Sequence, residues 1–299
     1  MKVLKFGGTS VGSIESLQSV KKIVSSRQER VIVVVSAMSG VTNSLIAMCD
    51  QARQGDEQCL QELPALAERH HAALKAVSIS GFAAYGDVMI DKFINESLAG
   101  HLRHLIANRE LPEQEQQTIC DTVIAHGELL SSLLVSSMFE GCDAAFAPDF
   151  IKTRPDGDGR VLDWAATERA IHEQLGAVTA QCVVTQGFIA KDAETGRITN
   201  LGRGGSDYTA AIIAAVLDAE ALEIWTDVDG FMTADPRTHP DATVIDEMTY
   251  EQAQAMCDAG AKVIYAPTIA PVAQKGIPVW VKNTFNPDCR GTVIQSSKS

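Results

Sequence analysis

The sequence predicts one α/β domain with two lobes arranged around a mainly parallel sheet. Residues 31–35 are all β-branched and apolar, which is typical of a parallel strand covered on both faces. Glycine-rich turns follow a strand and precede a helix near residues 6–13 and again near residues 200–210. Strand-like and helical segments alternate at both ends of the chain, and we place the boundary between the lobes near residue 200.

The composition excludes several classes of partner. The 299 residues are 45% hydrophobic and 21% charged, which is enough apolar sequence for a sizeable core. The net charge of −13 repels nucleic acids and anionic membranes, so we expect neither as a partner. No apolar run approaches a membrane span, and the seven cysteines form no C-x-x-C pair, so we expect reduced thiols in a cytoplasmic protein.

Periodicity and turn residues predict the elements in order. The first half has strands at 3–6 and 31–35, a helix at 13–28, and helical segments at 42–54, 56–77, 88–109 and 113–140. The second half has strands at 143–148, 150–152, 181–189, 222–226 and 278–282, helices after 210 and at 164–175, 248–258 and 268–275, and turns at 154–160 and 194–197. The histidines of the helical segments are expected to face solvent without a metal role: His70, His71, His101 and His104.

The first candidate site is the turn that follows the first strand. Lys5 stands immediately before Gly7 and Gly8. A lysine in such a short strand is either solvated at a sheet edge or directed at a phosphate brought close to the backbone. The small polar turn at 36–43 ends the next strand, at the position where open α/β sheets bind ligands.

The second candidate site is the glycine loop at 200–209. A glycine turn that leads into a helix offers free N–H groups and a positive dipole end to an anion. Arg203 adds a fork suited to a carboxylate or phosphate, and Ser206 or Asp207 is expected as the N-cap. The alternative is an ordinary junction between a loop and a helix.

The third candidate site lies inside a helical segment. Gly127 interrupts the helical pattern, which indicates a close approach of another backbone or a helix start. The adjacent Glu128 either complements a helix dipole or binds the ammonium group of a ligand. The P-loop, G-x-G-x-x-G and protein-kinase motifs are absent from the sequence.

Five motifs together resemble the aspartokinase signature set of the amino acid kinase superfamily, in the same order along the chain. They are Lys5-Phe6-Gly7-Gly8-Thr9-Ser10, Leu201-Gly202-Arg203-Gly204-Gly205-Ser206-Asp207, Ile224-Trp225-Thr226-Asp227-Val228-Asp229-Gly230, Asp235-Pro236-Arg237 and Gly260-Ala261-Lys262-Val263. The resemblance is greatest to the kinase portion of bifunctional aspartokinase–homoserine dehydrogenases. The sequence departs from the family pattern at two places: Met232 stands where many relatives have an aromatic residue near the nucleotide, and Tyr265-Ala266 replaces the usual His-Pro.

The resemblance implies a three-layer α/β/α sandwich, the amino acid kinase fold. It also implies ATP-dependent phosphorylation of the aspartate β-carboxylate, the first step of lysine, threonine and methionine biosynthesis. Mg²⁺ would be held mainly through the ATP phosphates rather than by protein ligands. The implied catalytic residues are Lys5 and Asp207. The implied substrate-binding residues are Ser39, Thr42, Glu128, Phe188, Arg203, Gly204 and Ser206. The implied nucleotide-binding residues are Gly7, Gly8, Thr226, Asp227, Arg237 and Lys262.

Two other functions remain as alternatives. One is a sibling kinase of the same fold that acts on glutamate, acetylglutamate or a nucleoside monophosphate. The other is a catalytically silent ligand-binding subunit, which is expected to lack Lys5 or Asp207. We expect residues 1–295 to form the kinase domain, with 1–199 binding substrate, 200–295 binding nucleotide and 296–299 as a tail. Without a regulatory or dehydrogenase domain, activity is expected to be insensitive to lysine and threonine, with at most a weak homodimer.

Overall fold

The structure is a computed structural model, and it describes residues 1–157, 159–234, 238–239 and 241–297. Its strands are β1 (Lys2–Phe6), β2 (Val31–Val35), β3 (Cys142–Ala145), β4 (Lys152–Asp156), β5 (Gly159–Leu162), β6 (Cys182–Gln186), β7 (Ile189–Asp192), β8 (Ile198–Asn200), β9 (Ala221–Thr226), β10 (Glu247–Met248), β11 (Val279–Asn283) and β12 (Thr292–Ile294). Its α-helices are α1 (Ile14–Ser25), α2 (Val41–Arg53), α3 (Leu63–Val77), α4 (Ala83–Asp91), α5 (Ala99–Ala107), α6 (Glu113–Ser136), α7 (Trp164–Ile171), α8 (Gly205–Val216), α9 (Tyr250–Asp258) and α10 (Ile269–Gln274). Short 3₁₀ or π segments are η1 (Glu57–Glu62), η2 (Lys92–Leu98), η3 (Ala147–Asp149), η4 (His172–Gly176) and η5 (Ala266–Thr268).

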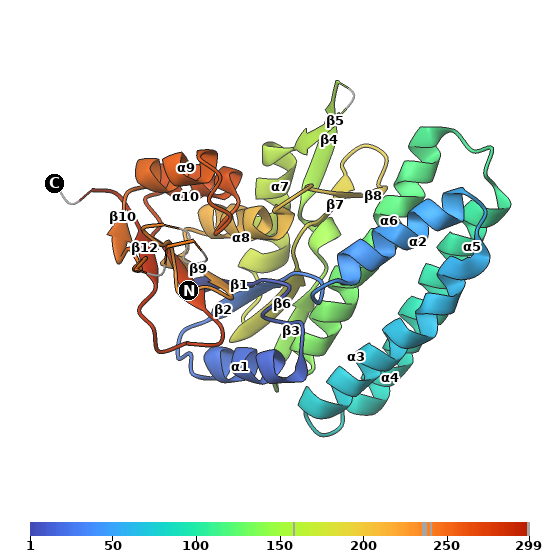
Figure 1. The fold of residues 1–299 in the computed structure, drawn as a ribbon, viewed down its shortest axis with the longest axis horizontal. Coiled ribbons are helices and arrows are strands. Elements are labelled where there is room, and N and C mark those ends of the chain that lie inside the picture. Colours follow the sequence, from blue (N-terminus) through green and yellow to red (C-terminus); the bar gives the residue numbers. More distant parts are fainter. Residues whose placement is uncertain (158, 235–237, 240, 298–299) are drawn as a thin grey trace.

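The described residues form a large sheet of eight strands in the order β10-β12-β11-β9-β1-β2-β6-β3. Every neighbouring pair is parallel except β11 and β12, which are antiparallel. β1 lies between β2 and β9, so Lys5 belongs to an interior strand and is not at a sheet edge (Figure 1). A second sheet of four strands has the order β5-β4-β7-β8.

Helices cover both faces of the large sheet because side chains alternate along each strand. Leu4 and Phe6 pack in one apolar cluster with residues of α1, α2, α3, α5 and α6. Val3 and Ile32 pack in a second cluster with residues of α7, α8, α9 and α10 (Figure 1). The predicted α/β/α sandwich with a mainly parallel sheet is therefore confirmed.

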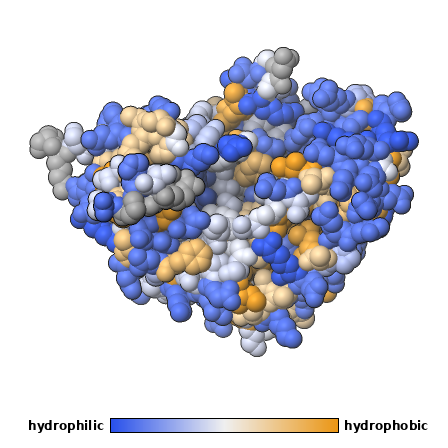
Figure 2. Space-filling model, in the orientation of Figure 1, coloured by the Kyte–Doolittle hydropathy of each residue, from blue (hydrophilic) through white to orange (hydrophobic). Residues whose placement is uncertain are grey.

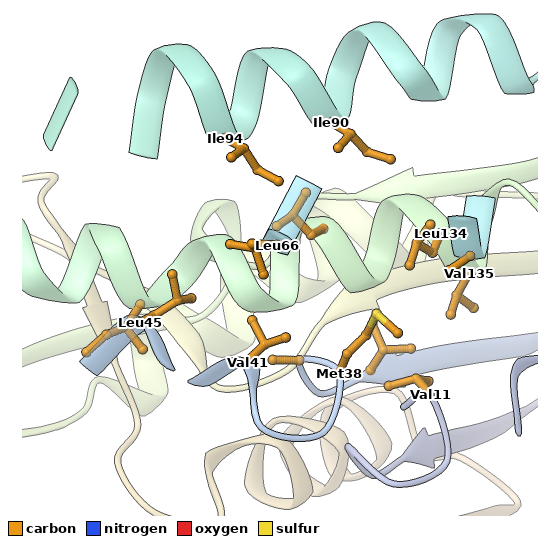
Figure 3. Close-up of a cluster of buried hydrophobic side chains, with 14 of the residues drawn as sticks. Val11, Met38, Val41, Leu45, Leu66, Ile90, Ile94, Leu134 and Val135 are labelled. Carbon is orange, nitrogen blue, oxygen red and sulfur yellow. The ribbon is translucent and has the colours of Figure 1, made fainter. Parts of the chain in front are cut away.

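One part of the first cluster positions the turn that follows β2. The buried side chains of Met38 and Val41 point into a group that includes Leu66, Ile94 and Leu134 (Figure 3). These apolar anchors come from α3, η2 and α6. The turn between β2 and α2 is thereby held against the helical layer, which leaves its polar side chains available to the other side.

Helix α6 departs from the expectation that no apolar run approaches a membrane span. Its length and composition would allow it to cross a membrane, but most of its apolar stretch is buried inside the fold. The helix packs against α2, α5 and β6. Its apolar character therefore follows from its central place in the core.

Several elements near residues 143–200 differ from those that the sequence predicts. The expected strand at 143–148 ends at Ala145 and passes into η3, and the expected turn at 154–160 is the hairpin of β4 and β5. The expected strand at 181–189 divides into β6 and β7 because Phe188 adopts a positive φ of 66° between them. Local propensity gave no signal for this backbone conformation, which is uncommon for a bulky residue.

Two further expectations need correction. The strand expected at 278–282 is β11, and β12, which was not predicted, follows it and pairs with it in the antiparallel direction. His70 does not face solvent: it is fully buried, its Nδ1 lies 2.7 Å from the carbonyl oxygen of Leu66, and burial lowers its pKa to about 4. The lowered pKa means that His70 is neutral at pH 7 and behaves as a core residue.

Candidate active site

A pocket of about 350 Å³ opens where β1, β2 and β6 end and where α8 begins. Figure 2 shows this side of the molecule hollowed in the middle of the view, between the C-terminal elements and the helical layer. The pocket brings together both predicted catalytic residues and all predicted substrate-binding residues: Lys5, Ser39, Thr42, Glu128, Phe188, Arg203, Gly204, Ser206 and Asp207. These residues are scattered over more than two hundred positions of the chain, and only the fold joins them.

Lys5 and Asp207 form an ion pair at the base of the pocket. The Lys5 Nζ lies 2.6 Å from Asp207 Oδ1, and each side chain is only 11% exposed. The second oxygen of Asp207, Oδ2, accepts a hydrogen bond of 3.1 Å from the backbone N–H of Tyr265. Two elements therefore hold the carboxylate, and the carboxylate in turn holds the ammonium group at the end of β1.

Glu128 is a second carboxylate that lines the pocket. It is 3% exposed, and its Oε1 accepts a hydrogen bond of 3.1 Å from the backbone N–H of Ala37. Its Oε2 is buried without a partner in the described part of the chain. Burial raises the pKa of Glu128 to about 8, and the hydrogen bond from Ala37 and the charge of Lys5 only partly oppose this shift. A buried, unpaired carboxylate oxygen beside a cavity fits a cationic ligand group.

Gly127 explains how Glu128 reaches this position. A Cβ atom at residue 127 would lie 2.8 Å from the Cβ of Ala37, so a side chain there would push α6 away from the turn after β2. The close approach brings the Glu128 carboxylate within reach of the Ala37 N–H group. The sequence prediction of a close backbone approach at Gly127 agrees with this contact.

The glycine loop enters α8 through a left-handed residue. Gly204 has a φ of 71° and is the N-cap, so the expectation that Ser206 or Asp207 would cap the helix was wrong. Both side chains lie instead in the first turn of α8 and are directed at the pocket. A Cβ atom at Gly204 would lie 2.2 Å from Cγ of Tyr265, so the ring of Tyr265 packs directly on this glycine.

Arg203 precedes this cap and is exposed. It forms no ion pair with any other described residue, so its guanidinium is available to an anion. The dipole of α8 also presents its positive end to the pocket. Arg203 and Glu128 thus offer opposite charges to a ligand within one cavity.

Phe188 occupies the pocket in a strained conformation. Its N–H donates a 3.1 Å hydrogen bond to Thr209 Oγ1, and its carbonyl oxygen accepts one of 2.9 Å from the N–H of Leu201. These bonds hold a left-handed φ that costs a nonglycine residue roughly 1–2 kcal/mol. Strain of this kind is common at ligand sites.

The predicted nucleotide-binding residues do not all line this pocket. Gly8 does, whereas Gly7 donates its N–H to the carbonyl oxygen of Trp225 at 3.0 Å and so joins the ends of β1 and β9. Thr226 and Asp227 end or follow β9 near this junction, and Lys262 is exposed in the loop after α9. The predicted Arg237 lies outside the described residues.

Sequence reasoning missed several residues that line the pocket: Ser36, Ala37, Met38, Gly40, Asn43, Gly202 and Gly205. Most belong to the turn at 36–43, which was recognised as a ligand-binding position without assigning each residue a role. The contacts of Tyr265 with Asp207 and Gly204 were not predicted either. Across the described ranges, no three His, Cys, Asp or Glu side chains lie together in a way that could hold a metal ion.

The geometry of the pocket and the fold agree with the comparisons to known proteins. The sequence model of the amino acid kinase family matches residues 1–283. The chain therefore belongs to the amino acid kinase family.

Within that family, the chain is similar to aspartokinases. It is 35% identical over 297 residues to the lysine-sensitive aspartokinase 3 of Escherichia coli strain K12. The matched region covers 98% of this chain and 63% of that protein. It is 32% identical over 302 residues to the chloroplastic bifunctional aspartokinase/homoserine dehydrogenase 1 of Arabidopsis thaliana, covering 98% of this chain and 32% of that protein. The crystal structure of E. coli aspartokinase III in complex with aspartate and ADP matches with a TM-score of 0.88 at 30% identity, over 100% of this chain and 65% of that one. The chain thus spans about a third to two thirds of the length of these relatives.

Proposed function

We propose that this chain transfers the γ-phosphoryl group of ATP to the β-carboxylate of L-aspartate, which gives 4-phospho-L-aspartate and ADP. The observation that carries the proposal is the unpaired Oε2 of Glu128, buried in a pocket that also contains Lys5 and Arg203. An amino acid with an acidic side chain has one ammonium and two carboxylate groups. Glu128 would bind the ammonium, Arg203 the α-carboxylate, and Lys5 would lie beside the reacting carboxylate.

The similarity to aspartokinases supports this assignment over other members of the family. The E. coli aspartokinase III structure is a complex with aspartate and ADP. The alternative of a silent ligand-binding subunit is disfavoured because Lys5 and Asp207 are present and paired.

The chemistry needs no general base. The aspartate β-carboxylate has an ordinary pKa of about 3.9 and is already the nucleophile at pH 7. The difficulty is to bring an anion to a polyanion, so catalysis depends on positioning and on charge neutralisation. Lys5 would neutralise the phosphoryl oxygens, and Asp207 would keep the ammonium group in place.

The nucleotide would lie beside the pocket, along the ends of β1 and β9. We assign Thr226, Asp227 and Lys262 to this part of the site, with Gly7 and Gly8 close to the phosphates. Mg²⁺ would be held mainly by the phosphate oxygens, because Mg²⁺ in such sites takes few protein carboxylates. When bound, it would supply charge neutralisation on the transferred group.

The test is an ATP-dependent hydroxamate assay with L-aspartate, L-glutamate and N-acetylglutamate as acceptors. Aspartate is expected to be the preferred acceptor, and N-acetylglutamate is expected to be inactive because it has no ammonium group for Glu128. A Glu128→Gln variant is expected to raise KM for aspartate at least tenfold, roughly the loss of one charge-assisted hydrogen bond. Preferred turnover of glutamate or N-acetylglutamate would assign the chain to a sibling activity and overturn the proposal.

A further inference from the structure

A second chemical feature lies at the end of the large sheet opposite the pocket. Cys142 begins β3, Cys182 begins β6, and the two residues are direct partners in the parallel register. Their Sγ atoms are 3.6 Å apart. β3 is the edge strand of this sheet, so the pair lies near the surface of the molecule.

We propose that Cys142 and Cys182 form a modification site: a dithiol that a peroxide oxidises reversibly to a disulfide. The Cys142 thiolate would attack one peroxide oxygen, break the O–O bond and become a sulfenic acid while the other oxygen leaves as water. The Cys182 sulfur would then attack the Cys142 sulfur and displace a second water. In sum, two thiols and one hydrogen peroxide give one disulfide and two waters.

The backbone is already suited to the bond. Directly paired residues of neighbouring strands have Cα atoms about 4.8 Å apart, within the range of about 4.4–6.8 Å that disulfides occupy. Because the two cysteines are in register, their side chains emerge on the same face of the sheet. The sulfur atoms must approach by about 1.6 Å to reach bonding distance, which side-chain rotation can supply.

The pair is also accessible to a small oxidant. Cys182 lines a cavity of about 390 Å³ whose rim includes the exposed residues Ser25 and Glu140. Cys142 is half-buried, and its hydrogen bond with the Cys182 thiol lowers the pKa of Cys142. The thiolate is the reactive form, so Cys142 is the residue expected to react first.

A pair of neighbouring thiols in the helical layer is less accessible to an oxidant. Cys49 on α2 and Cys120 on α6 contact each other, but each is only 2% exposed. An oxidant must open the core to reach them. The pair on β3 and β6 therefore stands out by combining proximity, register and access.

Peptide mapping of the folded protein by mass spectrometry tests the proposal. After treatment with hydrogen peroxide and blocking of free thiols, trypsin and a glutamate-specific protease separate Cys142 from Cys120, because Glu128 and Glu140 lie between them. We expect a linked pair of peptides that contains Cys142 and Cys182, lighter than the separate peptides by two hydrogens, and that dithiothreitol separates.

The controls use variants at Cys142 and at a distant thiol. Cys142→Ser and Cys142→Ala are expected to yield no linked pair, whereas Cys289→Ser, in the loop before β12, is expected to yield it as the wild type does. Recovery of Cys142 as a free thiol or as a sulfinic acid without the linked pair, at peroxide levels that oxidise Cys289, would overturn the proposal. A disulfide in the wild type that joins Cys182 to a cysteine other than Cys142 would overturn it as well.

Discussion

Glu128 should make the free protein less stable as the pH rises. Its pKa is about 8 in the folded protein against an ordinary value of 4.5, because burial disfavours the charged form. The unfolded chain therefore releases this proton at a pH where the folded chain still holds it. Stability contributed by the protonated group is fully present below pH 4.5 and is lost progressively up to about pH 8.

The size of the effect follows from the shift. Each pH unit inside this window changes the free energy of unfolding by about 1.4 kcal/mol, so wild type loses roughly 3 kcal/mol between pH 5 and pH 7.5 through this group. Glu128→Gln removes the titration and keeps an oxygen for the N–H of Ala37. The variant should gain on wild type over the same range, by roughly 5–10 °C in Tm.

Thermal unfolding of both proteins at pH 5 and pH 7.5, without substrate, measures this gap. Glu140→Gln is the matched control, because Glu140 is an exposed carboxylate just beyond the end of α6. Its Tm difference from wild type should be the same at both pH values. If the gap between Glu128→Gln and wild type does not widen with pH, Glu128 is ionised in the free protein and the argument from burial is wrong.

Three further outcomes are expected. Lys5→Ala should lower kcat by roughly 100-fold or more and leave KM for aspartate within a few-fold of wild type. Lys2→Ala, on the same strand, is the control and should keep wild-type kinetics. An unchanged kcat in Lys5→Ala would show that Lys5 has no catalytic role. KM for aspartate should fall as the pH rises from 6 to 8, by up to about tenfold per pH unit, because binding of the ammonium group requires Glu128 to ionise. A KM that does not change with pH would contradict this linkage. Gly204→Ala should lower Tm more than Gly202→Ala. Both glycines have a φ near 70°, but only a Cβ atom at residue 204 would meet the side chain of Tyr265. Equal losses of Tm would show that the Tyr265 ring moves away at no cost.

Much of the fold could be predicted because several strands and helices carry a clear apolar pattern of their own. The all-apolar β2 and the helices with regular apolar spacing matched the expected ranges closely. Most of the errors in strand bounds fall between residues 142 and 200, where the chain makes short strands, hairpins and a bulky residue with positive φ. Such strands are stabilised by their partners in the second sheet and not by their own composition, so sequence pattern alone could not define them.

In the candidate site, too, some residues have a local sequence signal and others do not. Glycine motifs and the residues beside them indicated Lys5, Arg203 and Asp207, because a glycine turn before a helix carries a physical signal of its own. Glu128 was marked only by the glycine before it. The hydrogen bond from Tyr265 to Asp207 could not be predicted, since it depends on the path of a loop that is 58 residues away in sequence.

The two carboxylates of the pocket have different partners, and this difference gives the site its charge pattern. Lys5 could in principle neutralise either one, since its charge lowers the pKa of Glu128 to a small extent. The ion pair with Asp207 at 2.6 Å, together with the N–H of Tyr265, commits Lys5 to Asp207. Among the residues that the structure describes, Glu128 is thereby left without a cation, at a cost in stability that a bound ammonium group would offset. A carboxylate that destabilises the empty protein is in this way the part of the pocket best able to select an amino acid.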